Sequence, residues 1–126
     1  MKRIFTLVFS SLILLSFTSL IGIEDVVAGL KSGNASQIAR YFDNTVEITL
    51  PAKSNSYSKS QAEVILKDFF SNNVVKSFKP LHKGDNGGSQ FCIGTLQTNT
   101  ASYRTTIYMK QKGDKQVLQE IRFENQ

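Results

Sequence analysis

The sequence contains only one cysteine and one histidine in 126 residues. A lone cysteine cannot form a disulfide within the chain, so the fold must be stabilised by packing. One histidine, one cysteine and scattered carboxylates give none of the short ligand spacings of a zinc site, so we expect no bound metal. The sequence also has no phosphate-binding loop, no dinucleotide fingerprint and no Gly-x-Ser-x-Gly nucleophile motif. We therefore expect no cofactor.

Basic residues outnumber acidic ones but are not clustered. The chain has 15 Lys and Arg against 10 Asp and Glu, which gives a net charge of +5. They form no run, whereas a nucleic-acid-binding surface needs basic residues gathered on one face. We therefore expect a solvated surface and no nucleic-acid partner.

The first 22 residues have the pattern of an export signal. Lys2 and Arg3 precede residues 4–21, which carry no charge, and small residues gather from Ser16 to Gly22. An uncleaved membrane anchor is the alternative, because 18 uncharged residues approach the length of a bilayer span. Serines and threonines interrupt the run, and its densest apolar part has the length of a signal core, so a cleaved signal is favoured.

Cleavage of this segment defines the expected domain and its location. The cut lies after Thr18 or near Gly22, and no cysteine lies near it to carry a lipid anchor. We expect a signal peptide at residues 1–22 and one domain at residues 23–126, since about 100 residues suffice for a single core. The protein is then periplasmic or secreted, with no membrane attachment after cleavage.

Three helices are expected in the mature chain. The first spans residues 23–31 and ends at Gly33. The second begins at the N-cap residue Asn34 and buries Ile38, Tyr41 and Phe42. The third and longest spans residues 58–73. Its N-cap residue Ser58 has Gln61 in capping-box spacing, and apolar residues recur along it with helical period.

The strands predict the fold class. Residues 46–50 alternate as a half-buried strand that stops at Pro51, and residues 53–56 are expected to form a polar loop. After the long helix, four further strands are separated by glycine- and asparagine-rich turns; they are residues 74–83, 90–98, 102–112 and 115–124. We predict an α+β fold: a cone-like, curved antiparallel sheet, made of a four-strand meander plus a short N-terminal strand, packed by one long and two short helices.

Alternation along the last two strands predicts which residues share a face of the sheet. Pairing through the Gly113–Asp114 turn places a mixed polar and apolar set on the outer face; its members are Arg104, Tyr108, Leu118, Glu120 and Arg122. The opposite set faces the long helix: Ile107, Met109, Val117, Ile121 and Phe123. The outer face is hydrophobic enough to bind a partner, so we hypothesise a homodimer, and a simply solvated face is the alternative.

The order of elements, with Gly33-Asn34 and the stretch at residues 41–48, resembles the nuclear-transport-factor-2-like superfamily. The segments KSGNA, YFDNTVEI, YSKSQAEVILKDFF and LQEIRFE are similar to a family of small exported bacterial proteins with this fold, which is a domain of unknown function. Cystatin-like domains share the arrangement of a helix on a meander. Their inhibitory Gln-x-Val-x-Gly loop is absent here, so the shape implies no protease inhibition.

The resemblance implies a cavity between the helices and the concave face of the sheet. The residues expected to line it are Tyr41, Phe42, Leu66, Phe69, Phe70, Ile107 and Phe123. Enzymes of the superfamily place Asp, His or Tyr in this cavity. The corresponding candidate here is His82, as a general base with Asp43 or Asp85. The alternative is a half-exposed strand residue, which is favoured because no positioned partner is evident.

Three functions follow from these expectations. The first is an exported, non-catalytic binding or accessory domain that holds a small amphipathic ligand in the cavity or a protein partner on the sheet. The second is an isomerase- or dehydratase-type enzyme that uses His82 and a cavity carboxylate such as Glu47 or Glu120. The third is a structural partner in an envelope assembly. The scarcity of acid-base groups favours binding, and fold alone supplies no reaction.

Overall fold

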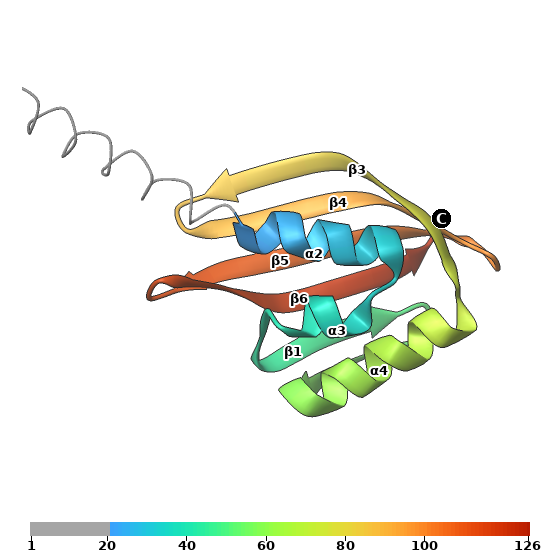
Figure 1. The fold of residues 1–126 in the computed structure, drawn as a ribbon, viewed down its shortest axis with the longest axis horizontal. Coiled ribbons are helices and arrows are strands. Elements are labelled where there is room, and N and C mark those ends of the chain that lie inside the picture. The colour runs from blue at the N-terminus through green and yellow to red at the C-terminus, as the bar shows by residue number, and fades with distance from the viewer. Residues whose placement is uncertain (1–20) are drawn as a thin grey trace, which may run out of the picture.

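The computed structural model describes residues 21–126, which form one layer of helices on one curved sheet (Figure 1). The helices are α2 (Ile21–Ser32), α3 (Ala35–Ala39) and α4 (Lys59–Asn72). The strands are β1 (Phe42–Leu50), β2 (Lys53–Ser58), β3 (Val75–Asn86), β4 (Ser89–Thr98), β5 (Ser102–Lys112) and β6 (Lys115–Asn125). The predicted α+β class, the three helices and the four-strand meander are confirmed.

The sheet is mixed rather than antiparallel. Its strands lie in the order β2-β1-β6-β5-β4-β3, and every neighbouring pair is antiparallel except β1 and β6, which are parallel. The prediction of an all-antiparallel sheet is wrong at this pair. A period-2 pattern assigns residues to the two faces of a sheet but does not encode the direction of the neighbouring strand. The sequence pattern therefore could not indicate that β1 and β6 are parallel.

The predicted polar loop at residues 53–56 is instead the edge strand β2. It pairs with β1 along its whole length, from Thr45 opposite Ser58 to Leu50 opposite Lys53. The hydroxyls of Thr49 and Ser54 also lie 2.9 Å apart. Asparagine is depleted in strands, and serine and asparagine are both common in turns. The composition of residues 53–56 therefore predicted a loop rather than a strand.

Capping sets the helix starts as predicted, but the second helix is shorter than expected. Gly33 adopts a left-handed φ of 66°, and the side chain of Asn34 accepts a hydrogen bond from the Gln37 amide. The chain leaves the helix at Arg40, because the Tyr41 carbonyl accepts a hydrogen bond from the Leu118 amide of β6. Tyr41 and Phe42 therefore lie outside α3, and Phe42 is the first residue of β1.

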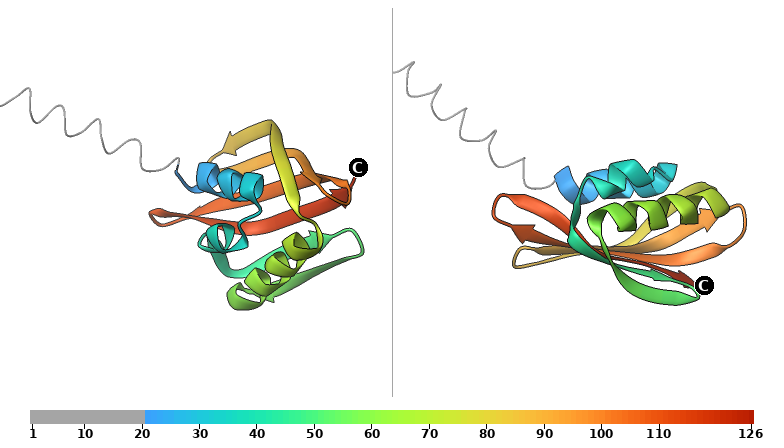
Figure 2. Two further views of the ribbon diagram at one scale, coloured as in Figure 1. Left: turned by 45° about the vertical axis from the view of Figure 1, so that its right-hand side comes forward. Right: turned by 90° about the horizontal axis from the view of Figure 1, so that it is seen from below.

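All three helices cover the same face of the sheet (Figure 2). The first, α2, packs on β3 and β4, whereas α4 packs on β1 and β2. The long helix was expected over the meander; it lies mainly over the N-terminal hairpin, and its aromatic residues reach the meander from the side. Within residues 21–126, no helix lies on the opposite face of the sheet.

A bulge in β6 reverses the predicted faces near the start of that strand. Tyr108 pairs with Glu120 and Met109 pairs with Leu118, so Gln119 is an extra residue in the ladder. Leu118 is consequently fully buried under the helices, and its predicted place on the outer face is wrong. Val117, predicted to face inward, is half-buried and pairs with Lys110.

Phe123 is a fully buried member of the aromatic core. Its ring stacks on Phe69 at a centroid distance of 4.4 Å and meets Phe70 edge-on at 6.0 Å. Phe69 also makes an edge contact with Tyr103 at 5.4 Å. These rings join α4 to β5 and β6, and such aromatic pairs add to the stabilisation from burial alone.

Replacing Phe123 with alanine should lower the free energy of unfolding by about 3–5 kcal/mol, since it leaves a cavity beside the two rings that Phe123 contacts. Urea unfolding followed by circular dichroism measures the loss. Val74→Ala is the control, because Val74 is 54% exposed and should change stability by less than about 0.5 kcal/mol. A loss below about 1 kcal/mol for Phe123→Ala would show that the core does not depend on this ring.

Candidate functional site

The space expected to form an internal cavity is filled by side chains. Leu66, Ile107 and Phe123 are fully buried, and Phe69 and Phe70 are 6% and 7% exposed. None of the surface hollows described below includes Leu66, Phe69, Ile107 or Phe123. The residues predicted to line a ligand cavity are therefore mostly core residues, and only Tyr41, Phe42 and Phe70 border a hollow.

Tyr41 and Phe42 border a hollow of about 520 Å³, which we call the Tyr41 hollow. It lies where the start of α2, the α3–β1 link, the start of α4 and the β5–β6 turn meet. Its lining residues are Gly22, Arg40, Tyr41, Phe42, Asp43, Asn44, Lys59, Gln111, Asp114, Lys115, Gln116 and Val117. The volume lies within the range of small-molecule sites.

The phenol of Tyr41 is held by an aspartate from α2. Its hydroxyl donates a 2.6 Å hydrogen bond to Asp25 Oδ2, and Gln37 Nε2 donates to the Asp25 carbonyl at 2.9 Å. Burial, followed by the hydrogen bond to Asp25, raises the pKa of Tyr41 to about 12. The phenol stays protonated at neutral pH and therefore keeps donating this hydrogen bond to Asp25. The bond holds Tyr41 in place in the wall of the hollow.

The charged side chains of the Tyr41 hollow are unevenly paired. Asp43 Oδ2 lies 2.8 Å from Lys112 Nζ and accepts from Gln119 Nε2 at 3.1 Å. The Lys112 hydrogen bond lowers the pKa of Asp43. Basic residues line the hollow without any ion pair among residues 21–126; they are Arg40, Lys59 and Lys115. Asp114 also lines the hollow and has no ion pair among residues 21–126, so the unpaired basic residues outnumber the unpaired acidic one and the hollow favours an anion.

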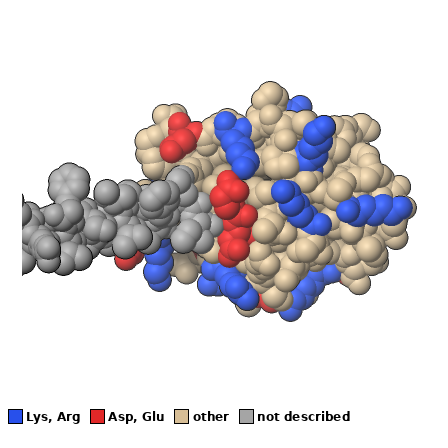
Figure 3. All heavy atoms as spheres, turned by 45° about the horizontal axis from the view of Figure 1, so that its top comes forward, with Lys and Arg blue, Asp and Glu red and all other residues tan. Residues whose placement is uncertain are grey.

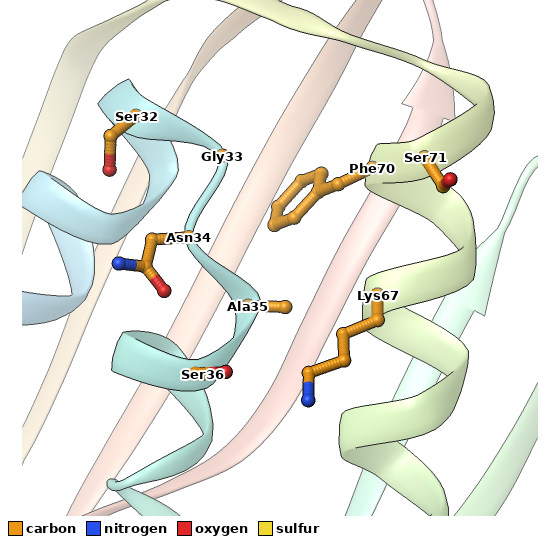
Figure 4. Close-up of a pocket in the computed structure, with 8 residues that line it drawn as sticks. All are labelled: Ser32, Gly33, Asn34, Ala35, Ser36, Lys67, Phe70 and Ser71. Atoms are coloured by element: carbon orange, nitrogen blue, oxygen red, sulfur yellow. The ribbon is translucent and has the colours of Figure 1, made fainter.

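A second hollow of about 460 Å³ separates the α2–α3 turn from α4 (Figure 4). Figure 4 shows Phe70 pointing from α4 toward Gly33 and Ala35, with Lys67 extended beside it and Ser71 pointing away. Its main polar groups are already engaged, since Lys67 pairs with Glu63 at 2.9 Å and Asn34 caps α3. This hollow offers few free groups to a ligand.

The uncovered outer face of the sheet carries a row of aromatic and acidic side chains. The row crosses five strands through paired positions: Gly84, Phe91, Tyr108, Glu120 and Glu47. A Cβ on Gly84 would lie 2.0 Å from Phe91 Cε1, so the Phe91 ring lies flat over this glycine. The Tyr108 hydroxyl bonds to Ser89 Oγ at 2.9 Å. Two ordered aromatic rings thus lie side by side on this face.

Beside Tyr108 the outer face is hollowed and acidic. A depression of about 450 Å³ is bordered by Asp43, Glu47 and Glu120. Arg122 Nε lies 3.0 Å from Glu120 Oε2, and that hydrogen bond raises the pKa of Arg122. Four of the five predicted interface residues do lie on this face, namely Arg104, Tyr108, Glu120 and Arg122.

Among residues 21–126, no hydrogen bond or ion pair joins His82 to a carboxylate. It lies exposed on the edge strand β3, where it pairs with Ile93 and so faces outward. Glu47 and Glu120 share the outer face but lie on β1 and β6, three or more strands away in the sheet order. Asp85 pairs with Gln90, which puts it on the opposite face from His82.

The remaining titratable groups form no cluster in the described part of the chain. No three His, Cys, Asp or Glu side chains within residues 21–126 are placed to hold a metal ion. Cys92 is fully buried, and burial raises the pKa of its thiol. On the face seen in Figure 3 the Lys and Arg side chains lie apart from one another. None of the helices within residues 21–126 is both long and apolar enough to cross a membrane.

Asp43→Asn should lower the free energy of unfolding at pH 7 by about 0.5–1 kcal/mol, since Lys112 is 52% exposed. The folded-state pKa of Asp43 is depressed, so its contribution is present above about pH 4 and lost as the pH falls through the folded value. The variant should therefore lose less stability on acidification than the parent in urea titrations. Asp114→Asn is the control. If both substitutions changed the free energy of unfolding equally, the stabilisation could not be assigned to the Asp43–Lys112 pair.

Three comparisons place the chain among known proteins. A family profile described as Domain of unknown function (DUF4783) matches residues 23–124. No curated protein matches. The chain is 31% identical to a DUF4783 family protein from Bacteroides uniformis, with a TM-score of 0.79 over 82% of this chain and 95% of that one. A DUF4783 family protein from Bacteroides fragilis is also 31% identical, with a TM-score of 0.77 over 81% and 96%.

A more distant structure shows the fold. An NTF2-like protein of unknown function from Cytophaga hutchinsonii is 7% identical and has a TM-score of 0.59 over 81% of this chain and 84% of that one. At this identity the likeness concerns the fold alone. The chain belongs to the DUF4783 family, a domain of unknown function with the nuclear-transport-factor-2-like fold.

Proposed function

We propose that this protein is an exported, non-catalytic accessory domain that associates with a second copy of itself through the outer face of its sheet. The supporting observation is that all helices cover one face, while the other carries an ordered aromatic row flanked by charges. Export is supported by the signal-like residues 1–22, which precede the matched family domain. The catalytic alternative has less support, because His82 lies exposed on an edge strand.

The outer face is large enough for a stable dimer. Six strands spaced about 4.8 Å apart span about 24 Å, and the strands, which have 6 to 12 residues, are on average about 33 Å long. Their product, roughly 800 Å², is similar to the area that each partner buries in a standard interface.

Charged residues flank the aromatic centre of the outer face. Glu47, Glu120 and Glu124 lie on β1 and β6 beside Arg122. Arg104, Lys110 and Lys79 lie on β5 and β3. A two-fold axis along β5 would place β1 and β6 of one copy opposite β3 and β4 of the other. Tyr108 would then lie on the axis against its counterpart, and Phe91 on β4 would face β6 of the other copy.

Tyr108→Glu should convert the dimer to a monomer, because it places an unpaired carboxylate at the centre of the interface. Sedimentation velocity of the mature protein, recovered after export from a bacterial host, measures the change at micromolar concentration. Ser71→Glu on α4 is the control with the same charge change, and it should remain dimeric. A parent protein that sediments only as a monomer would refute the proposal.

A second candidate function is the binding of a small amphipathic anion in the Tyr41 hollow. The observation that favours it is the set of three basic side chains without ion pairs beside the apolar surfaces of Tyr41, Phe42 and Val117. A carboxylate would meet the basic groups while its alkyl chain contacts the apolar wall. Such a ligand would lie at the edge of the helix layer rather than inside the packed core.

Hexanoate should shift the amide NMR resonances of Tyr41 and Val117, whereas hexylammonium, which has the same alkyl chain and the opposite charge, should not. Arg40→Gln should weaken hexanoate binding by about tenfold, the effect of one charge-assisted hydrogen bond. Arg104→Gln on the outer face is the control. Equal shifts from both probes would show that the hollow does not select an anion.

A further inference from the structure

The two edges of the sheet are protected very differently. The free edge of β3 carries Lys76, Lys79 and Lys83, contains Pro80, and is interrupted by two register irregularities. Lysines, proline and bulges all prevent a further strand from pairing at an edge. Another chain therefore cannot readily extend the sheet at β3.

The opposite edge, at β2, has none of these features along residues 54–58. This segment reads Ser-Asn-Ser-Tyr-Ser, has no lysine or proline, and pairs with β1 in an uninterrupted register. A strand at the edge of a sheet presents unpaired backbone N–H and C=O groups on its free side. Because the β2 edge is unprotected, these groups are available to an added strand.

An apolar hollow lies directly beside this edge. Its volume is about 410 Å³, and its lining residues come from β2 and from α4: Tyr57, Ser60, Gln61, Val64 and Ile65. Val64 is 65% exposed, more than Val74 or Leu81, the other exposed large hydrophobic residues within residues 21–126. In an added strand, alternate side chains would point toward the helix layer and could enter this hollow.

The charged residues at the two ends of β2 are basic, whereas Glu47 of β1 lies opposite the middle of the strand at Ser56. Residues 50–62 contain Lys53 and Lys59 and no acidic residue. The next carboxylate, Glu63, is already paired with Lys67 at 2.9 Å. Lys53 and Lys59 bracket the strand, so an extended peptide with acidic residues toward its ends would meet a basic residue at each end.

We propose that β2 and α4 form a strand-addition site for an extended, acidic-ended peptide segment of a partner protein. The peptide backbone pairs with the free edge of β2. One of its apolar side chains fills the hollow beside Val64 and Tyr57, and its terminal acidic residues lie near Lys53 and Lys59. The site is separate from the outer face proposed for the dimer.

The probe is a seven-residue peptide, acetylated and amidated, in which isoleucine and threonine alternate between two terminal glutamates. Its binding to the mature protein is measured by fluorescence anisotropy of a labelled peptide, and amide hydrogen exchange locates the site. We expect saturable binding that protects the amides of residues 53–58 and leaves those of β3 unchanged. A peptide with the same side chains but N-methylated internal amides should not bind, because it cannot donate backbone hydrogen bonds.

Val64→Glu should weaken binding of the probe by at least about tenfold, since it puts a carboxylate into the hollow. Val74→Glu makes the same change at an exposed valine outside the hollow and should leave affinity within about twofold. Replacing the terminal glutamates of the probe by lysines should also weaken binding. Tyr108→Glu should leave binding unchanged, which separates this proposal from that of the dimer.

Three results would overturn the proposal. The first is equal binding of the N-methylated peptide, which would indicate simple hydrophobic contact. The second is absence of binding at about 1 mM probe, the limit of weak recognition. The third is protection from amide hydrogen exchange at residues 53–58 that increases with protein concentration when no peptide is present. Such protection would show that a second copy occupies the β2 edge.

Discussion

β1 joins the meander only through β6, and the parallel ladder between them holds the two parts of the fold together. The contact begins where the Tyr41 carbonyl accepts the Leu118 amide and continues through Ile48 opposite Ile121. Because α4 packs on β1 and β2, this ladder also brings Phe69 and Phe70 onto Phe123. Without it, β1, β2 and α4 would lose their backbone connection to the meander.

Aromatic rings pack the concave side of the sheet beneath α4. The fully buried Phe123 contacts two other rings there, so this region is densely packed core. The outer face carries an aromatic row because Gly84 lets Phe91 lie flat beside Tyr108. The single helix layer thus leaves one side of the sheet to the packed core and exposes the aromatic row on the other.

Sequence patterns located most elements because local chemistry determines them. Asn34 and Ser58 cap helices as their spacing indicates, and alternation identifies all four meander strands. The failures have non-local causes. β2 is a strand only because β1 pairs with it, and the bulge at Gln119 alone moves Leu118 inward. The Asp25–Tyr41 bond joins residues 16 apart on different elements, a spacing that no motif marks. The Tyr41 hollow therefore could not be assembled from sequence.

The outer face and the β2 edge belong to one sheet, but their proposed occupants do not meet. A peptide added beside β2 would lie next to Ser56, which pairs with Glu47 and borders the acidic depression with it. With a two-fold axis along β5, β1 of one copy lies opposite β3 of the other, so β2 and an added strand lie outside the overlap of the two sheets. Peptide binding and dimerisation should therefore be independent, because thermodynamic linkage between two sites requires that each binding event changes the affinity of the other.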